Sequence, residues 1–433
     1  MRNKVNIVTL GCSKNIVDSE YLIAQLSGNS FEVVHDSNDE SSKTVIINTC
    51  GFIDAAKEES INVILNFAQA KRAGIIERLF VFGCLSERYK AALKDEIPEV
   101  DEFFGAKNLK EIIRAIGGNF KDELVGERIV TTPSHYAYLK ISEGCDRGCG
   151  YCAIPAIRGK HVSVPMETLM SQTRKLAESG VKELLIIAQD STCYGLDLYK
   201  KRRIADLLNR LSTVEGIKWI RLHYAYPAAF PEDLMHEMRD NPKICKYLDI
   251  PFQHINNGVL KNMRRGITAE ETYRLIERLR KTVPGIALRT TLLTGHPGES
   301  QGAFDELKQF VEKARFERLG VFPYSEEEGT YSARNFRDEI SKKQKSARAN
   351  EIMEMQQKIS TEINAGKRGQ SLTVIVDRLE DRFVICRSEH DSPEIDQEVL
   401  IRKDWKSSLL MPGDFVKARI TATGDYDLYA EID

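Results

Sequence analysis

Residues 143–152 read EGCDRGCGYC and place Cys145, Cys149 and Cys152 in one short loop with the spacing C-x3-C-x2-C. The run directly follows a predicted strand at 138–141. Three thiolates from one loop can bind three irons of a 4Fe-4S cluster and leave the fourth iron open. An open iron can bind a substrate, so this loop predicts a catalytic iron-sulfur site.

A structural zinc site is the alternative for this loop. Such a site normally has four protein ligands in a closed tetrahedron. No histidine and no fourth cysteine belongs to the run. The missing fourth ligand favours the iron-sulfur interpretation, because an active cluster requires an open position.

Alternating strand and helix patterns surround the cysteine run. After a linker that contains Pro133, six apolar runs are each followed by a helical pattern, which predicts a partial (β/α)6 barrel over 131–365. The predicted strands are 138–141, 183–188, 219–222, 247–250, 286–293 and 319–322. In barrels of this kind the functional groups lie in the loops that follow the strands.

The segment before the cysteine run, 3–118, has the same rhythm. Its predicted buried strands are 5–10, 44–48 and 79–82, each followed by a helix, which indicates a parallel α/β sheet domain.

The segment after the barrel has a different pattern. Apolar residues spaced three and four apart over 341–365 predict an amphipathic connector helix, and residues 368–433 predict a small β-barrel. The strands expected in that small barrel are 372–376, 383–386, 415–420 and 428–432.

Composition agrees with a globular protein of about three domains. The chain has 433 residues, 42% of them hydrophobic and 29% charged, and its formal net charge is −2, which argues against a polycation that binds nucleic acid through its overall charge. No apolar run approaches the roughly 18 residues of a membrane span. Nine cysteines fit metal ligation in a reducing compartment better than a disulfide framework, so we expect a cytoplasmic protein.

Three further cysteines occupy equivalent positions in the first predicted domain. Cys12, Cys50 and Cys84 each follow a predicted parallel strand of the first domain. Because the carboxyl ends of strands in such sheets meet at one edge, these thiols are expected to form a second three-cysteine site. The alternative is three small buried core residues, since free cysteine is often buried.

Four strand ends of the predicted barrel are expected to offer further ligand contacts, at 189–190, 223–226, 294–299 and 324–329. Gln189 follows one strand, and the turn TGHPGE at 294–299 follows another, where Gly295 and Pro297 would let a nucleotide-like ligand approach the backbone and Glu299 would be free to accept from it. The alternative for the turn is simple punctuation between a strand and a helix.

The chain resembles the radical S-adenosylmethionine (SAM) methylthiotransferases over essentially its whole length. The resemblance rests on LGCSKNIVDSE, NTCGFI, the segment from YLKISEGCDRGCGYC to IRGKHVS, and RSEHDSPEIDQEV. The chain departs from the pattern after HVS, where it reads VP in place of RP. The resemblance implies an N-terminal methylthiotransferase domain, a radical SAM core and a C-terminal TRAM domain.

The resemblance also implies an activity and its cofactors. Cys145, Cys149 and Cys152 would hold a 4Fe-4S cluster that cleaves SAM to a 5'-deoxyadenosyl radical, and that radical would abstract hydrogen from an aspartate β-carbon. Cys12, Cys50 and Cys84 would hold an auxiliary 4Fe-4S cluster that presents the sulfur. Tyr151, Gln189, Gly295, Pro297 and Glu299 are the expected SAM contacts.

Within the family, these segments resemble the members that modify protein S twelve of the small ribosomal subunit. Residues 368–433 carry nine basic and fourteen acidic residues, a net charge of −5, whereas a module that grips RNA is expected to be basic. An acidic face suits a basic ribosomal protein, free or in the subunit. We expect an electron donor such as a flavodoxin, and a monomer. The rival functions are methylthiolation of tRNA adenosine and a non-catalytic iron-sulfur protein that binds RNA or ribosomes.

Overall fold

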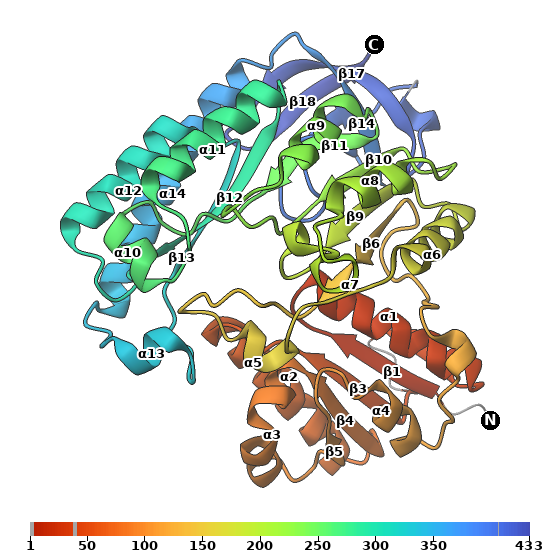
Figure 1. Cartoon of the computed structure of the whole chain (residues 1–433). Coiled ribbons are helices and arrows are strands. Elements are labelled where there is room, and N and C mark those ends of the chain that lie inside the picture. Colours follow the sequence, from red (N-terminus) through yellow and green to blue (C-terminus); the bar gives the residue numbers. More distant parts are fainter. Residues whose placement is uncertain (1–3, 38–40, 406) are drawn as a thin grey trace. The chain divides into compact units, whose positions relative to one another are not determined.

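The computed structural model describes residues 4–37, 41–405 and 407–433, and the chain folds into two compact units (Figure 1). The first unit contains the residues up to Thr132 together with Ser142–Arg147 and Cys152–Val162. The second contains Pro133–Ile141, Gly148–Tyr151 and Ser163–Asp433. The cysteine run therefore contributes residues to both units.

A five-stranded parallel sheet in the order β2-β1-β3-β4-β5 forms the first unit. Its strands are β1 (Lys4–Thr9), β2 (Glu32–His35), β3 (Thr44–Thr49), β4 (Arg78–Gly83) and β5 (Glu102–Phe103). Its helices are α1 (Ser13–Gly28), α2 (Asp54–Arg72), α3 (Cys84–Glu96), α4 (Leu109–Ala115) and α5 (Ile154–Arg158), with a 3-10 turn at Asp122–Leu124.

Helices cover both faces of this sheet because successive strand residues point to opposite sides. Val5, Ile7 and Ile46 pack with α1 and α4 in one apolar cluster. Val45 and Ile47 pack with α2 and α3 in another. This arrangement confirms the predicted parallel α/β domain, and it leaves the carboxyl edge of the sheet to the loops that carry cysteines.

A six-stranded parallel sheet in the order β13-β12-β11-β10-β9-β6 forms the centre of the second unit and confirms the partial (β/α)6 barrel. Its strands are β6 (Tyr136–Lys140), β9 (Glu183–Ile187), β10 (Trp219–Leu222), β11 (Ile244–Asp249), β12 (Ala287–Thr294) and β13 (Arg318–Pro323). The helices of this region are α6 (Met166–Glu178), α7 (Leu196–Tyr199), α8 (Ile204–Ser212), α9 (Glu232–Asp240), α10 (Asn257–Asn262), α11 (Ala269–Thr282), α12 (Gln301–Ala314) and α13 (Tyr331–Asn335).

The predicted connector is a packed helix, α14 (Lys342–Ala365). Ser341 caps it by accepting a hydrogen bond from the Gln344 backbone N–H. The helix contacts β13, the last strand of the open sheet, and the Gln356 side chain donates to the Phe316 carbonyl at 2.8 Å. It thus covers one margin of the sheet as well as joining two parts of the chain.

The C-terminal segment is the expected small barrel, closed in the order β14-β15-β16-β18-β17. Its strands are β14 (Ser371–Leu379), β15 (Phe383–Ser388), β16 (Val399–Arg402), β17 (Phe415–Thr423) and β18 (Leu428–Ile432). Sequence patterning did not predict β16 or, in the first unit, β2 and the two-residue β5.

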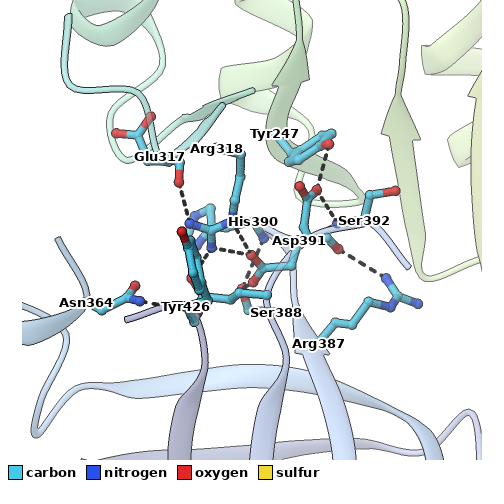
Figure 2. A network of polar contacts seen from close by, with 12 residues as sticks. Tyr247, Glu317, Arg318, Asn364, Arg387, Ser388, His390, Asp391, Ser392 and Tyr426 are labelled. Carbon is cyan, nitrogen blue, oxygen red and sulfur yellow. Dashed lines mark hydrogen bonds and ion pairs between the residues drawn. The ribbon is translucent and has the colours of Figure 1, made fainter. Parts of the chain in front are cut away.

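The small barrel packs against the amino-terminal ends of the parallel strands within the second unit. Trp219 of β10 and Phe415 of β17 meet edge to face, with ring centroids 4.9 Å apart. Arg318, the first residue of β13, donates from Nε to Asp391 Oδ1 at 3.0 Å, and the Tyr247 hydroxyl donates to Asp396 at 2.8 Å (Figure 2). These acidic residues lie in the loop between β15 and β16, and Ser392 of the same loop contacts His223, the residue after β10, with its Oγ 3.2 Å from Nε2.

Some acidic side chains of the C-terminal segment are buried in this contact with the parallel sheet. The side chains of Asp391 and Asp396 are 0% and 2% exposed and are paired with arginines of the parallel sheet. Part of the net charge of −5 is therefore internal and does not contribute to the acidic face that the sequence suggested. Charge composition alone is weaker evidence for a basic partner than the sequence suggested.

No helix in the described ranges is both long enough and apolar enough to cross a membrane.

Candidate metal centres

Cys12, Cys50 and Cys84 lie at the carboxyl ends of three neighbouring strands, β1, β3 and β4. Gly11 has φ +93°, and a Cβ at this position would lie 2.6 Å from the Cβ of Cys50. Only glycine therefore allows the loop before Cys12 to pass so close to the second cysteine. The strand-end prediction correctly located the three thiols at one edge.

The three thiols differ in exposure: Cys12 is exposed, Cys50 is half-buried and Cys84 is buried. Burial raises the pKa of Cys84 to about 11, against the opposite influence of Arg158, and the nearby Cys12 raises it further. Burial also raises the pKa of Cys50. Metal ligation requires thiolates, so loading this site must release protons.

Asn15 on α1 fixes the loops around these thiols. Its Nδ2 donates to the carbonyls of Leu10 and Thr49, at 2.8 and 3.2 Å. Its Oδ1 lies 3.9 Å from the sulfur of Cys84. One buried amide thus connects the ends of β1, β3 and β4, a role that the sequence alone did not indicate.

Cys149 of the other set lies in the second unit beside a buried arginine that sequence reasoning missed. Arg265 donates from Nη1 to the Cys149 sulfur at 3.3 Å and to the Tyr151 hydroxyl at 3.3 Å. Its guanidinium also lies 4.4 Å from the ring centre of Tyr226. A fixed positive charge here stabilises negative charge on the thiolate.

Backbone hydrogen bonds hold the middle of the cysteine run. The Gly150 N–H donates to the Met263 carbonyl at 2.8 Å, and the Gly150 carbonyl accepts from Ser332 N–H at 2.7 Å. In the first unit, Cys145 N–H donates to the Gly159 carbonyl at 3.0 Å. The loop is therefore held by main-chain contacts that do not depend on a bound group.

Among the described residues, no three His, Cys, Asp or Glu side chains converge closely enough to hold a single metal ion. In a cluster each thiolate binds its own iron, so the sulfurs need not meet at one point. The three thiols at the carboxyl edge of the first sheet are thus compatible with a cluster in which each would bind one iron.

The turn after β12 differs from expectation at its acidic residue. Glu299 accepts from the Gly295 N–H at 2.8 Å and from Arg348 Nη1 at 2.7 Å, and it is buried. Its carboxylate holds the turn and α14 together, where the sequence suggested a free acceptor. Gly295 has φ +76°, so glycine is required at this position, and Pro297 lies in the same turn.

The other strand ends of the second unit show backbone strain. Tyr224 after β10 has φ +58° and Gln253 after β11 has φ +72°. Non-glycine residues with positive φ are uncommon and cluster at functional sites. Gln189 directly follows β9, so the predicted contact and both strained residues belong to the carboxyl ends of the parallel strands.

Three family models match the chain. Residues 4–105 match the uncharacterized protein family UPF0004, residues 139–311 match the radical SAM superfamily, and residues 369–432 match the TRAM domain. The chain is 54% identical over 431 residues to the ribosomal protein uS12 methylthiotransferase RimO of Bacteroides fragilis, with 100% of this chain and 99% of that protein covered. The chain belongs to the RimO family. A RimO of Christiangramia forsetii is 53% identical over 430 residues, covering 99% of this chain and 94% of the relative.

Solved structures agree with this membership at the level of the fold. The radical SAM methyltransferase TsrM from Kitasatospora setae, with cobalamin and a [4Fe-4S] cluster bound, has a TM-score of 0.56 at 15% identity and covers 77% of this chain and 74% of its own. The cobalamin-dependent radical enzyme OxsB with aqua-cobalamin bound gives a TM-score of 0.53 at 13% identity, covering 82% and 56%. The family model over 139–311 and the relatives confirm the radical SAM resemblance stated from the sequence.

Proposed function

We propose that the chain is a radical SAM methylthiotransferase that attaches a methylthio group to the β-carbon of an aspartate in ribosomal protein uS12, the S twelve protein of the small subunit. The observation that carries this proposal is the pair of three-thiol sets, one in the loop after β6 and one at the carboxyl edge of the first sheet. Full-length similarity to the RimO family supports the choice of substrate.

In this proposal Cys145, Cys149 and Cys152 hold the 4Fe-4S cluster that binds SAM, and Cys12, Cys50 and Cys84 hold the auxiliary one. When bound, the clusters and SAM supply the radical and the sulfur, and the protein supplies orientation and exclusion of water. Arg265 stabilises the thiolate of Cys149 and fixes the hydroxyl of Tyr151.

The strand-end turns are proposed to bind SAM. Gly295 and Pro297 belong to a turn whose shape is set by the buried Glu299, which accepts from the Gly295 N–H, and the Pro297 carbonyl lies 3.0 Å from His296 Nδ1. Tyr151 packs against the apolar cluster of Val259, Met263 and Ala303, which would give the proposed SAM site an apolar side. Gln189 contributes from the end of β9.

The remaining features of the proposal follow from the chemistry. SAM cleavage needs an electron, so a donor such as a flavodoxin is the proposed partner, and ribosomal protein as substrate places the enzyme in the cytoplasm. We propose a monomer with domains at 3–118, 131–365 and 368–433, and no tRNA substrate.

The test compares the wild type with two triple alanine variants, one for each cysteine set, after anaerobic reconstitution. Wild type is expected to hold about eight irons and each variant about four. With SAM and reductant, only wild type is expected to add a methylthio mass to uS12. Cys386→Ala is the matched control, because this thiol is buried in the small barrel and belongs to neither set.

Four irons in wild type would contradict the second cluster. A methylthio gain on tRNA in a parallel incubation, with none on uS12, would identify tRNA as the substrate and contradict the proposed protein substrate. SAM cleavage absent from a fully loaded wild type would favour a non-catalytic iron-sulfur protein.

A further inference from the structure

A buried guanidinium in the first unit contacts one thiol of the strand-end set. Arg158 is the last residue of α5 and is 2% exposed. Its Nε and Nη2 lie 3.3 and 3.2 Å from the sulfur of Cys84. Both N–H groups donate to that sulfur, so the arginine presents two of its five donors to a proposed cluster ligand.

The rest of the guanidinium is held by three further partners in the same unit. Nη1 donates to Asp18 Oδ2 at 2.6 Å and faces Glu143 Oε2 at 3.5 Å, while Nη2 donates to Asn15 Oδ1 at 2.6 Å. The plane of the group is thereby fixed against the sulfur. Asp18 and Glu143 already compensate the buried charge, so a role confined to ion pairing would not require the contacts to Cys84.

Apolar packing between the α5 segment and the start of α3 holds Arg158 beside Cys84. Ala153 and Ile157 of the same segment form an apolar cluster with Cys84 at the start of α3. Arg158 is also only six residues beyond Cys152, so one short segment carries a ligand of the first set and a donor to the second.

An arginine is protonated at all physiological pH values, so its positive charge is permanent. The reduction potential of an iron-sulfur cluster depends on net charge and on hydrogen bonds to its sulfurs. A fixed cation with two N–H donors on a ligand sulfur stabilises the more negative, reduced state of the cluster. Removing it must therefore make reduction harder.

We propose that Arg158 is a positioning residue of the auxiliary site: it orients the sulfur of Cys84 and raises the reduction potential of the cluster that Cys12, Cys50 and Cys84 hold. This inference rests on the proposed function, because it requires a cluster on those three thiols. It assigns to the strand-end set a fourth protein residue that controls electron affinity without ligating iron.

The test uses the full chain with Cys145, Cys149 and Cys152 replaced by alanine, so that only the auxiliary cluster is present. In this parent, Arg158→Gln keeps an N–H donor and removes the charge, and Arg158→Lys keeps the charge and removes the planar two-donor geometry. Iron content, the electron paramagnetic resonance spectrum of the reduced state and the reduction potential are measured for each. None of these readouts depends on turnover.

We expect Arg158→Gln to shift the potential to a more negative value and to alter the reduced spectrum, and Arg158→Lys to shift the potential less. The matched control is Arg88→Gln, because the Arg88 guanidinium donates to the Gly51 carbonyl at 2.9 Å, next to Cys50. The control is expected to shift the potential less than Arg158→Gln.

An unchanged potential and spectrum in fully loaded Arg158→Gln would overturn the proposal, as would an equal shift in Arg88→Gln. If Arg158→Gln holds no iron while Arg158→Lys is fully loaded, the charge is needed to retain the cluster, which supports the proposal. If both variants lose iron, Arg158 is a structural residue and the proposal fails. A parent without iron would instead contradict the auxiliary cluster of the proposed function.

Discussion

At the scale of single residues, Gly295 shows why the turn after β12 has its sequence. It adopts φ +76°, and a Cβ would lie 2.2 Å from Cγ of Lys345. We predict that Gly295→Ala lowers the free energy of unfolding by about 2–4 kcal/mol, because backbone strain and a steric clash add. Gly266→Ala is the matched control: its φ is +65° and nothing lies within 4 Å, so about 1 kcal/mol is expected.

Thermal melting of both alanine variants checks this prediction. Equal shifts of the melting temperature would show that strain alone matters and that the approach of Lys345 contributes nothing.

His296 in the same turn predicts a pH dependence. Burial lowers its pKa from 6.5 to about 4. Between these values the unfolded chain binds a proton at this imidazole and the folded chain does not, so stability falls as pH falls from about 6.5 to 4, by up to about 3 kcal/mol. Melting temperatures of wild type and His296→Gln across this range measure the effect, and the variant should show the shallower slope. Substitution of the exposed His236 should leave the slope unchanged, and parallel wild-type and His296→Gln curves would contradict the assignment.

At the scale of elements, α14 is attached to the β12 turn through one buried ion pair. Arg348 and Glu299 are 6% and 0% exposed. Arg348→Met leaves the carboxylate buried without its cation, which should cost about 3–5 kcal/mol and weaken SAM binding in equilibrium dialysis. The control is Lys308→Met, which removes a pair with Glu351 of the same helix whose members are 27% and 49% exposed, and which should cost less than about 1 kcal/mol. Normal SAM affinity in a destabilised Arg348→Met would separate the turn from the binding site.

At the scale of the whole second unit, the small barrel and the parallel sheet share charges. Glu183 of β9 pairs with Arg221 of β10 and with Arg387 of β15, and all three are at most 2% exposed. Glu183→Gln removes the carboxylate partner of Arg221 and one of the two carboxylate partners of Arg387, which keeps Asp377, and we expect a loss of about 3–5 kcal/mol. Limited proteolysis should then release the C-terminal barrel, whereas Glu431→Gln, in a surface pair with Arg419, should not. A variant as resistant as wild type would mean that apolar packing around Trp219 suffices.

Much of the architecture was predictable because it depends on local patterns. Short apolar runs, each followed by a helical pattern, predicted both parallel sheets, and the strand Trp219–Leu222 was located to the residue. Strand β2 was missed because it is an edge strand whose four residues are all half-buried or exposed, and β5 because it has only two residues; β16 was missed as well. The location of Cys12, Cys50 and Cys84 at one edge of the sheet was predictable, because the carboxyl ends of parallel strands lie at the same edge.

The sequence by itself determined the fold class, the two sets of three thiols and the family, because spacing along one chain is enough to specify a cluster loop and a strand-end edge. Only the tertiary structure showed that Arg158 contacts the sulfur of Cys84 and Arg265 that of Cys149. It also showed that Glu299 is paired with Arg348 and that Asp391 is buried against Arg318. Each of these pairs joins residues between 49 and 116 positions apart. Electrostatic compensation of a buried charge depends on distances of a few ångströms in space, and no local pattern encodes which distant partner will supply it.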